Sequence, residues 1–158
     1  MLAAIAWNGA MAQEQVAAGN DALMGKLVEM IATGTHWEEA NLTNAGLAKL
    51  VSEKEMDEEC GEFSYFVYGR NVKAEKREGW NVSLDATGEH ALAIEVVLDT
   101  DNKTNLYFRD KADHDAFLNV AKKSAHYTND GHNSRIGSSL IEHDEQKKGW
   151  WVITFHAG

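Results

Sequence analysis

The chain has 158 residues, 44% of them hydrophobic and 25% charged, and its 15 basic and 25 acidic residues give a formal net charge of -10. These proportions are those of a single folded domain and exclude a disordered chain. The acidic excess argues against nucleic-acid binding, which needs a basic surface, and a single cysteine, Cys60, excludes an internal disulfide and a cysteine-based zinc cluster.

The first twelve residues carry no charge and end in Ala10-Met11-Ala12, the small-residue pattern of a signal peptidase site. We interpret residues 1–12 as the remnant of a secretory signal, so that residues 13–158 would form one domain in the periplasm or outside the cell. Because no basic residue precedes the apolar run, the alternative is an ordinary N-terminal helix of a cytoplasmic protein. The run is shorter than the roughly 20 residues that cross a bilayer, and we expect no membrane span.

Two helical segments are predicted after this region. Apolar residues recur every three or four positions between residues 14 and 32, which predicts an amphipathic helix ending at Gly34. A second segment is predicted from His36 to about Lys54, and Gly46 within it allows two short helices instead. The apolar residues that continue the helical spacing in this second segment are Leu47, Leu50 and Val51.

The next ten residues, 53–62, contain six acidic residues and one basic residue, a net charge of -5. Such a run is typical of a solvated connection. After Gly61 the apolar period changes from 3.6 to 2, which predicts strands. Four are expected, and short polar connections such as residues 70–79 imply that they pair antiparallel. They lie near residues 63–68, 80–84, 92–98 and 106–108.

A third helix is predicted from Asp110 to about Ser124, with Phe117 and Val120 on its buried face. A polar, glycine-bearing loop over residues 127–138 follows, and then two last strands, Ser139–His143 and Trp150–His156. This order predicts an α+β domain: a largely antiparallel sheet of about six strands, with N-terminal helices and one mid-chain helix packed mainly on one face.

Aromatic residues supply the predicted binding site. Trp150 and Trp151 are neighbours on one strand, so their side chains must point to opposite faces of the sheet. If helices cover one face only, aromatic side chains on the other face form a platform for a protein, peptide or glycan. The alternative is a sheet covered on both faces, with these residues in the core. The predicted binding residues are Phe66, Tyr68, Trp150 and Trp151.

Seven histidines raise the question of a metal site, which needs two or three of them near a carboxylate. The candidates are His126 and His132, which flank a loop, and Asp130 within that loop, and their spacing is not that of a known metal motif. The acidic residues Asp110 and Asp113 are explained by the positive end of the predicted helix. We expect no metal and no cofactor.

The sequence contains no phosphate-binding loop, dinucleotide motif or nucleophile elbow. It therefore favours a non-catalytic, extracytoplasmic binding or accessory domain for a protein, peptide or glycan, without excluding an enzyme. Two alternatives stay open. One is an acidic intracellular partner protein, such as a chaperone or an immunity-type inhibitor, that acts through residues 53–62. The other is a metal-dependent hydrolase.

Overall fold

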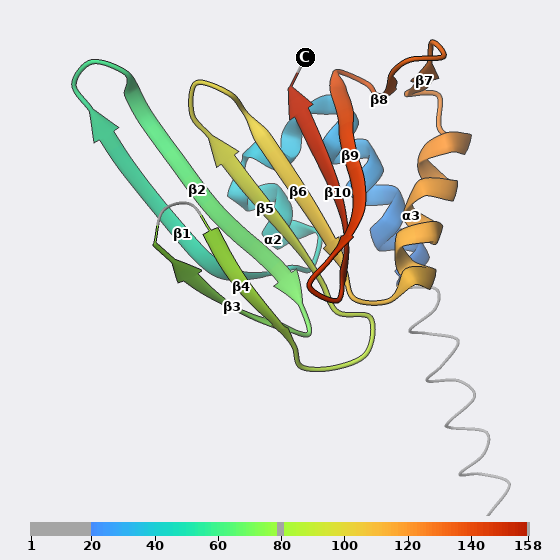
Figure 1. Cartoon of the computed structure of the whole chain (residues 1–158), viewed down its shortest axis with the longest axis horizontal. Helices are drawn as coiled ribbons and strands as arrows, with labels where there is room; N and C mark the ends of the chain where they lie inside the picture. Colours follow the sequence, from blue (N-terminus) through green and yellow to red (C-terminus); the bar gives the residue numbers. More distant parts are fainter. Residues whose placement is uncertain (1–19, 79–80, 158) are drawn as a thin grey trace, which may run out of the picture.

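The computed structural model describes residues 20–78 and 81–157 (Figure 1). An N-terminal helix is described over residues 20–33. The elements after it are η1 (Thr35–Trp37), α2 (Glu39–Asn44), β1 (Ala48–Asp57), β2 (Gly61–Arg70), β3 (Val72–Arg77), β4 (Asn81–Ala86), β5 (Leu92–Leu98), β6 (Lys103–Phe108), α3 (Lys111–Lys123), β7 (Tyr127–Asn129), β8 (Ser134–Ile136), β9 (Ser139–Lys147) and β10 (Trp150–Ala157). Residues 1–12, interpreted above as a signal remnant, lie outside the described ranges.

The main sheet has eight strands in the order β1-β2-β5-β6-β10-β9-β8-β7, and every neighbouring pair is antiparallel. Strands β3 and β4 form a separate two-stranded sheet. The predicted α+β class is confirmed, and so is the placement of helices in the N-terminal part and in the middle of the chain. The strand number was wrong, because the sheet has eight strands rather than about six.

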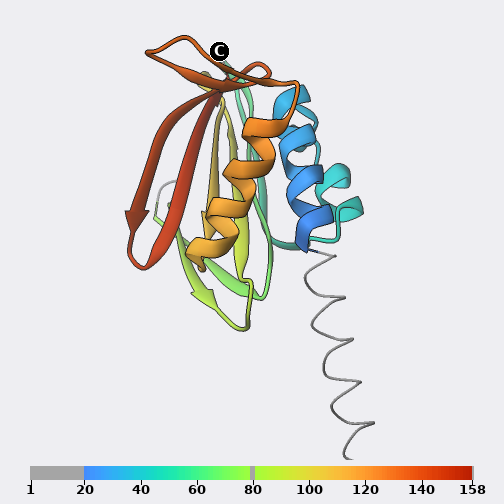
Figure 2. The ribbon, with the colours of Figure 1, turned by 90° about the vertical axis from the view of Figure 1, so that its right-hand side faces the viewer.

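Helices cover one face of the main sheet. Figure 2 shows the N-terminal helix and α3 side by side on that face. The larger hydrophobic core lies between them and the sheet, and it includes Leu27, Ile31, Phe117 and Phe155, none more than 1% exposed. No helix in the described part of the chain has both the length and the apolar composition needed to cross a membrane.

The opposite face carries a second, smaller core beneath the β3–β4 hairpin. Tyr65, Val67 and Ala93 of the main sheet cluster there with Val72 of the hairpin. The prediction of a connection over residues 70–79 was wrong, because β3 occupies most of it. Only alternate residues of β3 face the sheet, and the charged residues between them make its average composition that of a loop.

The predicted helix up to Lys54 is also wrong, since residues from Ala48 onward form β1. Gly46 has φ 94, a left-handed conformation that ends the helical segment before the strand starts. A β-bulge then shifts the register between Lys49 and Val51. The bulge inserts one residue into the strand, so the apolar residues follow a spacing that resembles that of a helix.

The acidic run is the tip of the β1–β2 hairpin, which Figure 1 shows projecting beyond its neighbours. Residues 52–60 are all exposed, as expected for a charged run, but most of them belong to strands rather than to a connection. Within the turn, the Asp57 carboxylate accepts hydrogen bonds from the backbone N–H groups of Glu59 and Cys60 at 2.8 and 2.9 Å.

The C-terminal half matches the predicted order, with three differences. Helix α3 buries Asp113 and His114 together with Phe117, whereas Val120 is only partly buried. The predicted loop over residues 127–138 contains the short strands β7 and β8, and β9 extends to Lys147. The last hairpin therefore turns within two residues, 148–149, whose φ angles of 52 and 81 fit a tight hairpin turn.

Candidate functional site

The two neighbouring indoles lie on opposite faces, as predicted. Trp150 belongs to the core on the hairpin side, and Trp151 packs against the core on the helix side. The expected exposure is wrong for three of the four predicted binding residues. Phe66 is 2% exposed, Tyr68 1% and Trp150 5%, whereas Trp151 is half-buried.

Each buried aromatic residue has identifiable neighbours. Phe66 and Tyr68 point to the helix-covered face, where the Tyr68 hydroxyl donates a hydrogen bond of 3.0 Å to Glu39 of α2. Trp150 is covered by the edge-on ring of Tyr107, with centroids 6.4 Å apart, and by the Arg109 guanidinium 5.8 Å from its ring centroid. These contacts occupy Phe66, Tyr68 and Trp150, which therefore do not form an open aromatic platform.

The three candidate metal ligands are engaged separately. His126 Nε2 lies 3.0 Å from the Glu29 carboxylate of the N-terminal helix. The Asp130 carboxylate accepts the backbone N–H groups of His132 and Asn133 at 2.9 and 2.7 Å, which closes its own loop. Within the described ranges, a different group brings potential metal-ligand atoms within 4.8 Å of one another. It consists of His90, Asp110 and Asp113.

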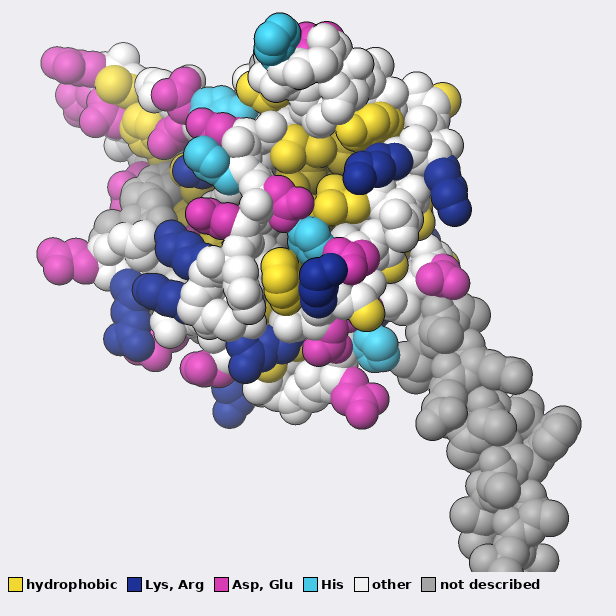
Figure 3. Space-filling view, turned by 45° about the vertical axis from the view of Figure 1, so that its right-hand side comes forward, with side chains coloured by type: hydrophobic (Ala, Val, Ile, Leu, Met, Phe, Trp, Pro, Cys, Tyr) yellow, Lys and Arg dark blue, Asp and Glu magenta, His cyan; other side chains and the backbone are white. Residues whose placement is uncertain are grey.

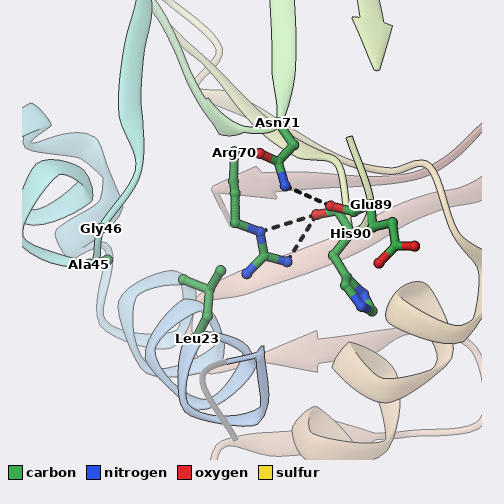
Figure 4. A pocket seen from close by; sticks show the side chains of 7 residues that line it. All are labelled: Leu23, Ala45, Gly46, Arg70, Asn71, Glu89 and His90. Carbon is green, nitrogen blue, oxygen red and sulfur yellow. Dashed lines mark hydrogen bonds between the residues drawn. The ribbon is translucent and has the colours of Figure 1, made fainter. Parts of the chain in front are cut away.

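That group adjoins a hollow of about 420 Å³, which falls within the size range of small-ligand pockets, roughly 300–1,000 Å³. The hollow forms where the N-terminal helix, the α2–β1 loop, the end of β2 and the β4–β5 loop meet (Figure 4). The topology brings these four segments together although they are far apart in sequence. Its lining residues are Leu23, Ala45, Gly46, Arg70, Asn71, Glu89 and His90.

Arg70 is held rigidly at this pocket by three hydrogen bonds. Its Nε and Nη2 donate to the backbone carbonyl of His90 at 3.1 and 2.9 Å, and Nη2 also donates to Asn20 Oδ1 at 2.8 Å. Burial lowers the pKa of Arg70 and the nearby Asp113 charge raises it, but an arginine side chain stays charged at any physiological pH. Nη1 makes no hydrogen bond to a described residue, and Figure 4 shows the guanidinium between Leu23 and His90. The pocket therefore offers a cationic N–H donor.

His90 is oriented by a buried carboxylate. Its Nδ1–H donates to Asp113, with 3.1 Å to each oxygen, and Asp113 is 3% exposed and also accepts a 3.0 Å bond from Asn20. The backbone N–H of His90 donates to Asp110 at 3.3 Å. With a proton on Nδ1, Nε2 accepts a hydrogen bond in the neutral ring and donates one in the charged ring. The pocket thus combines a cationic donor, Arg70, with an imidazole that Asp113 orients.

The pocket wall also contains backbone strain. Asn71 and His90 have φ values of 53 and 55, a left-handed conformation that costs a residue other than glycine about 1–3 kcal/mol. Asn71 is held there by its side chain, whose Nδ2 donates to the Glu89 carbonyl at 2.7 Å, and by its own carbonyl, which accepts the N–H of Thr87 at 2.8 Å. Such strain concentrates at functional sites.

The trio of His90, Asp110 and Asp113 could hold a cation by distance alone, but its electrostatic surroundings argue against this. Asp110 and Asp113 lie at the first turn of α3, whose unpaired N–H groups already supply positive potential. Asn20 then links Asp113 to the charged Arg70. The carboxylates therefore compensate positive charge that is already present, and we interpret the trio as the rigid support of His90.

A second polar cluster lies on the face of the main sheet that packs against the β3–β4 hairpin. The Glu95 carboxylate, 3% exposed, accepts hydrogen bonds from Tyr65 at 2.5 Å, Asn105 at 2.8 Å and Tyr107 at 2.9 Å. Burial and the Glu95 charge raise the pKa of both tyrosines above the ordinary value, so both stay protonated and donate. Every member is satisfied, which is the arrangement of a structural network.

Sequence reasoning missed this pocket. Arg70 and Asn71 fell in or beside a predicted connection, His90 was counted only as one of seven histidines, and Asp113 was explained by helix stabilisation. The interacting residues Arg70, His90 and Asp113 are separated by 20 and 23 positions, a spacing that carries no motif. No local signal could have united them.

Comparisons with known proteins gave no match: no protein-family model, no curated protein and no solved structure is similar to this chain at a significant level. The proposal below therefore depends on the geometry of the described residues.

Proposed function

We propose that this protein is a non-catalytic, extracytoplasmic binding or accessory domain, and that its binding site is the pocket at Arg70 and His90. The observation that carries the proposal is the rigid support of both groups. Arg70 makes three hydrogen bonds and His90 two to a buried carboxylate, so the cost of ordering them is already met in the free protein.

The chemistry of the pocket favours a peptide segment of a partner protein. Arg70 Nη1 can donate to a carbonyl or carboxylate oxygen, His90 Nε2 can accept from an amide N–H, and Leu23 supplies an apolar contact. A peptide unit carries an acceptor and a donor of this kind next to a side chain.

A binding role is favoured over catalysis because of what lines the pocket. The His90–Asp113 pair resembles the base and orienting carboxylate of a nucleophilic enzyme. However, the lining residues include no serine, threonine, cysteine or lysine that such a base could activate. An oriented imidazole without a nucleophile is suited to hydrogen bonding with a ligand.

The binding proposal can be tested by nuclear magnetic resonance on the full chain, with a pool of blocked tripeptides as the probe. We expect shift changes at the seven lining residues. Arg70→Lys keeps the charge but loses the planar guanidinium group and its several N–H donors, and it should weaken binding about tenfold. His90→Gln should weaken binding by a similar factor. Arg135→Lys, a matched change on β8, should have no effect. Shift changes confined to other surfaces, or equal binding by the Arg70 and Arg135 variants, would refute the proposal.

The extracytoplasmic part is tested separately, by mass spectrometry of the protein from its native source. A mature N-terminus near Gln13 is expected if residues 1–12 are a signal remnant. An intact Met1 would contradict export and would leave the binding proposal standing.

A further inference from the structure

Strand β1 is the outermost strand of the main sheet, and within the described residues it pairs with β2 alone. An edge strand presents unpaired backbone N–H and C=O groups along its outer side, which can pair with a further strand. At ten residues β1 is long for an edge, whereas β7 at the opposite end of the sheet has three residues. The two ends of the sheet therefore differ in what they offer a partner.

The two halves of β1 differ as well. The bulge between Lys49 and Val51 disrupts the first half, and bulges are one means by which proteins block pairing at an edge. From Val51 to Asp57 the pairing with β2 is continuous. The chain contains no proline, so no proline interrupts this regular edge. Residues 51–57 are therefore a regular strand edge; β3 contacts β1, where Lys76 reaches Glu53, but forms no backbone pairing with it.

Charge decides which strand would fit there. Figure 3 shows acidic side chains gathered on the projecting hairpin, at the upper left of the view. Lys76 forms an ion pair with Glu53, and Lys54 lies 3.8 Å from Glu62. Glu55, Glu58 and Glu59 form no ion pair with a described residue, and these exposed carboxylates would attract a basic segment.

The same edge carries an apolar contact. Among the described residues, Met56 is the large hydrophobic residue whose side chain is exposed, at 72%. A flexible methionine on a binding surface adapts to varied partner side chains. Backbone pairing would supply affinity, and the acidic residues with Met56 would supply selectivity.

We propose that residues 51–57 of β1 bind an extended, basic segment of a partner protein by strand addition. A second copy of this chain is the wrong occupant, because it would bring two runs of net charge -5 together. Residues 51–57 run to the tip of the β1–β2 hairpin, whereas Arg70 lies at the other end of β2. The two sites are therefore separate, and the two proposals can fail independently.

The probe is a blocked synthetic peptide as long as β1 (10 residues), with alternating lysine and valine. Its control peptide keeps every lysine but replaces the valines with proline, which cannot donate a backbone hydrogen bond. Titrated into the labelled full chain, the first peptide should shift the amide signals of residues 51–57. Its binding should weaken about tenfold between about 50 and 300 mM NaCl, as expected for exposed charges. The proline peptide should bind about tenfold more weakly in the same buffer.

Charge-reversal variants complete the test. Glu55→Lys with Glu58→Lys should weaken binding about tenfold or more. Glu142→Lys with Glu145→Lys, at exposed positions of β9, makes the same change in net charge and should have little effect. Equal losses in both pairs, equal binding of the two peptides, or self-association through residues 51–57 would each overturn the proposal. Arg70→Lys should leave this binding unchanged, which separates it from the pocket.

Discussion

His36 shows how one buried side chain links two elements. It is 1% exposed, its Nδ1–H donates to the Met30 carbonyl at 3.1 Å, and its Nε2 accepts the Thr104 hydroxyl at 2.8 Å. Burial lowers the pKa of this imidazole from 6.5 to about 4, despite the opposing effect of the Met30 carbonyl. The neutral ring joins the end of the N-terminal helix to β6.

This predicts a loss of stability in acid. Above pH 6.5 the ring is neutral in both the folded and the unfolded chain, so it does not make the free energy of unfolding depend on pH. Between pH 6.5 and about 4 the unfolded chain takes up the proton and the folded protein does not. The free energy of unfolding should therefore fall by about 1.4 kcal/mol per pH unit, or about 3 kcal/mol in total. Urea unfolding at several pH values would measure this.

His36→Gln provides the comparison, because other groups titrate in the same range. The variant should be less stable at neutral pH, since it loses one or both hydrogen bonds. Its stability should fall less steeply with acid than that of the natural protein. If the free energy of unfolding depended on pH in the same way in both proteins, the pKa of His36 would be the same in the folded and the unfolded chain, which would contradict the prediction.

Glu95 is the second residue whose environment allows a prediction. Glu95→Gln removes the charge that Tyr65 and Tyr107 donate to. Its NH2 group would replace one carboxylate oxygen, so it would direct donors either at the Tyr65 hydroxyl or at the Asn105 amide and the Tyr107 hydroxyl. We expect a loss of about 2 kcal/mol in the free energy of unfolding, the cost of an unsatisfied buried group. The pKa of both tyrosines should also fall, since the Glu95 charge helps to raise them. Urea unfolding of the variant and of the natural protein at neutral pH measures the loss of stability, and equal stability of the two would contradict the prediction.

At the scale of elements, the β8–β9 turn packs closely on the end of the N-terminal helix. Gly137 has φ 60, and a Cβ added to it would lie 2.1 Å from the Ala32 carbonyl oxygen. Ser139, just after the turn, donates its hydroxyl to the Ile31 carbonyl at 2.9 Å. The turn therefore satisfies a carbonyl at the end of a helix far from it in sequence.

Gly137→Ala should separate these two elements and lower the free energy of unfolding by about 2 kcal/mol or more, from the clash and the left-handed backbone together. Gly131→Ala is the matched control: its φ is 90, but nothing lies within 4 Å of an added Cβ. The control should lose only the conformational part, about 1 kcal/mol. Chemical denaturation of both variants tests the difference, and equal losses would show that the contact with Ala32 is not tight.

The elements also show where sequence periodicity succeeds. Helix α3 was predicted almost to the residue, because its acidic start and apolar stripe are local signals. The first part of β1, up to about Lys54, was predicted as a helix, because its bulge changes the apolar spacing. Strand β3 was missed, because its partner β4 and the sheet beneath it, rather than its own composition, stabilise it.

At the scale of the whole molecule, the net charge of -10 destabilises the folded state through self-repulsion. Raising NaCl from about 20 to 300 mM should screen this repulsion. A gain of about 1 kcal/mol in the free energy of unfolding would raise the melting temperature by about 3 °C in a chain of this size. Calorimetry at the two salt concentrations measures the shift, and Glu58→Lys with Glu59→Lys should reduce it. A melting temperature that falls with salt would contradict the prediction.

The sequence by itself determined the α+β class, the antiparallel pairing, the position of α3 and the opposite orientation of Trp150 and Trp151. All of these follow from local periodicity and from the geometry of a strand, which a few neighbouring residues are enough to specify. Only the tertiary structure decided that the β3–β4 hairpin covers part of the second face, that three of the four predicted aromatic residues are buried, and that Arg70, His90 and Asp113 lie together at one pocket. Burial and contact depend on residues distant in the chain, whose positions no local pattern specifies.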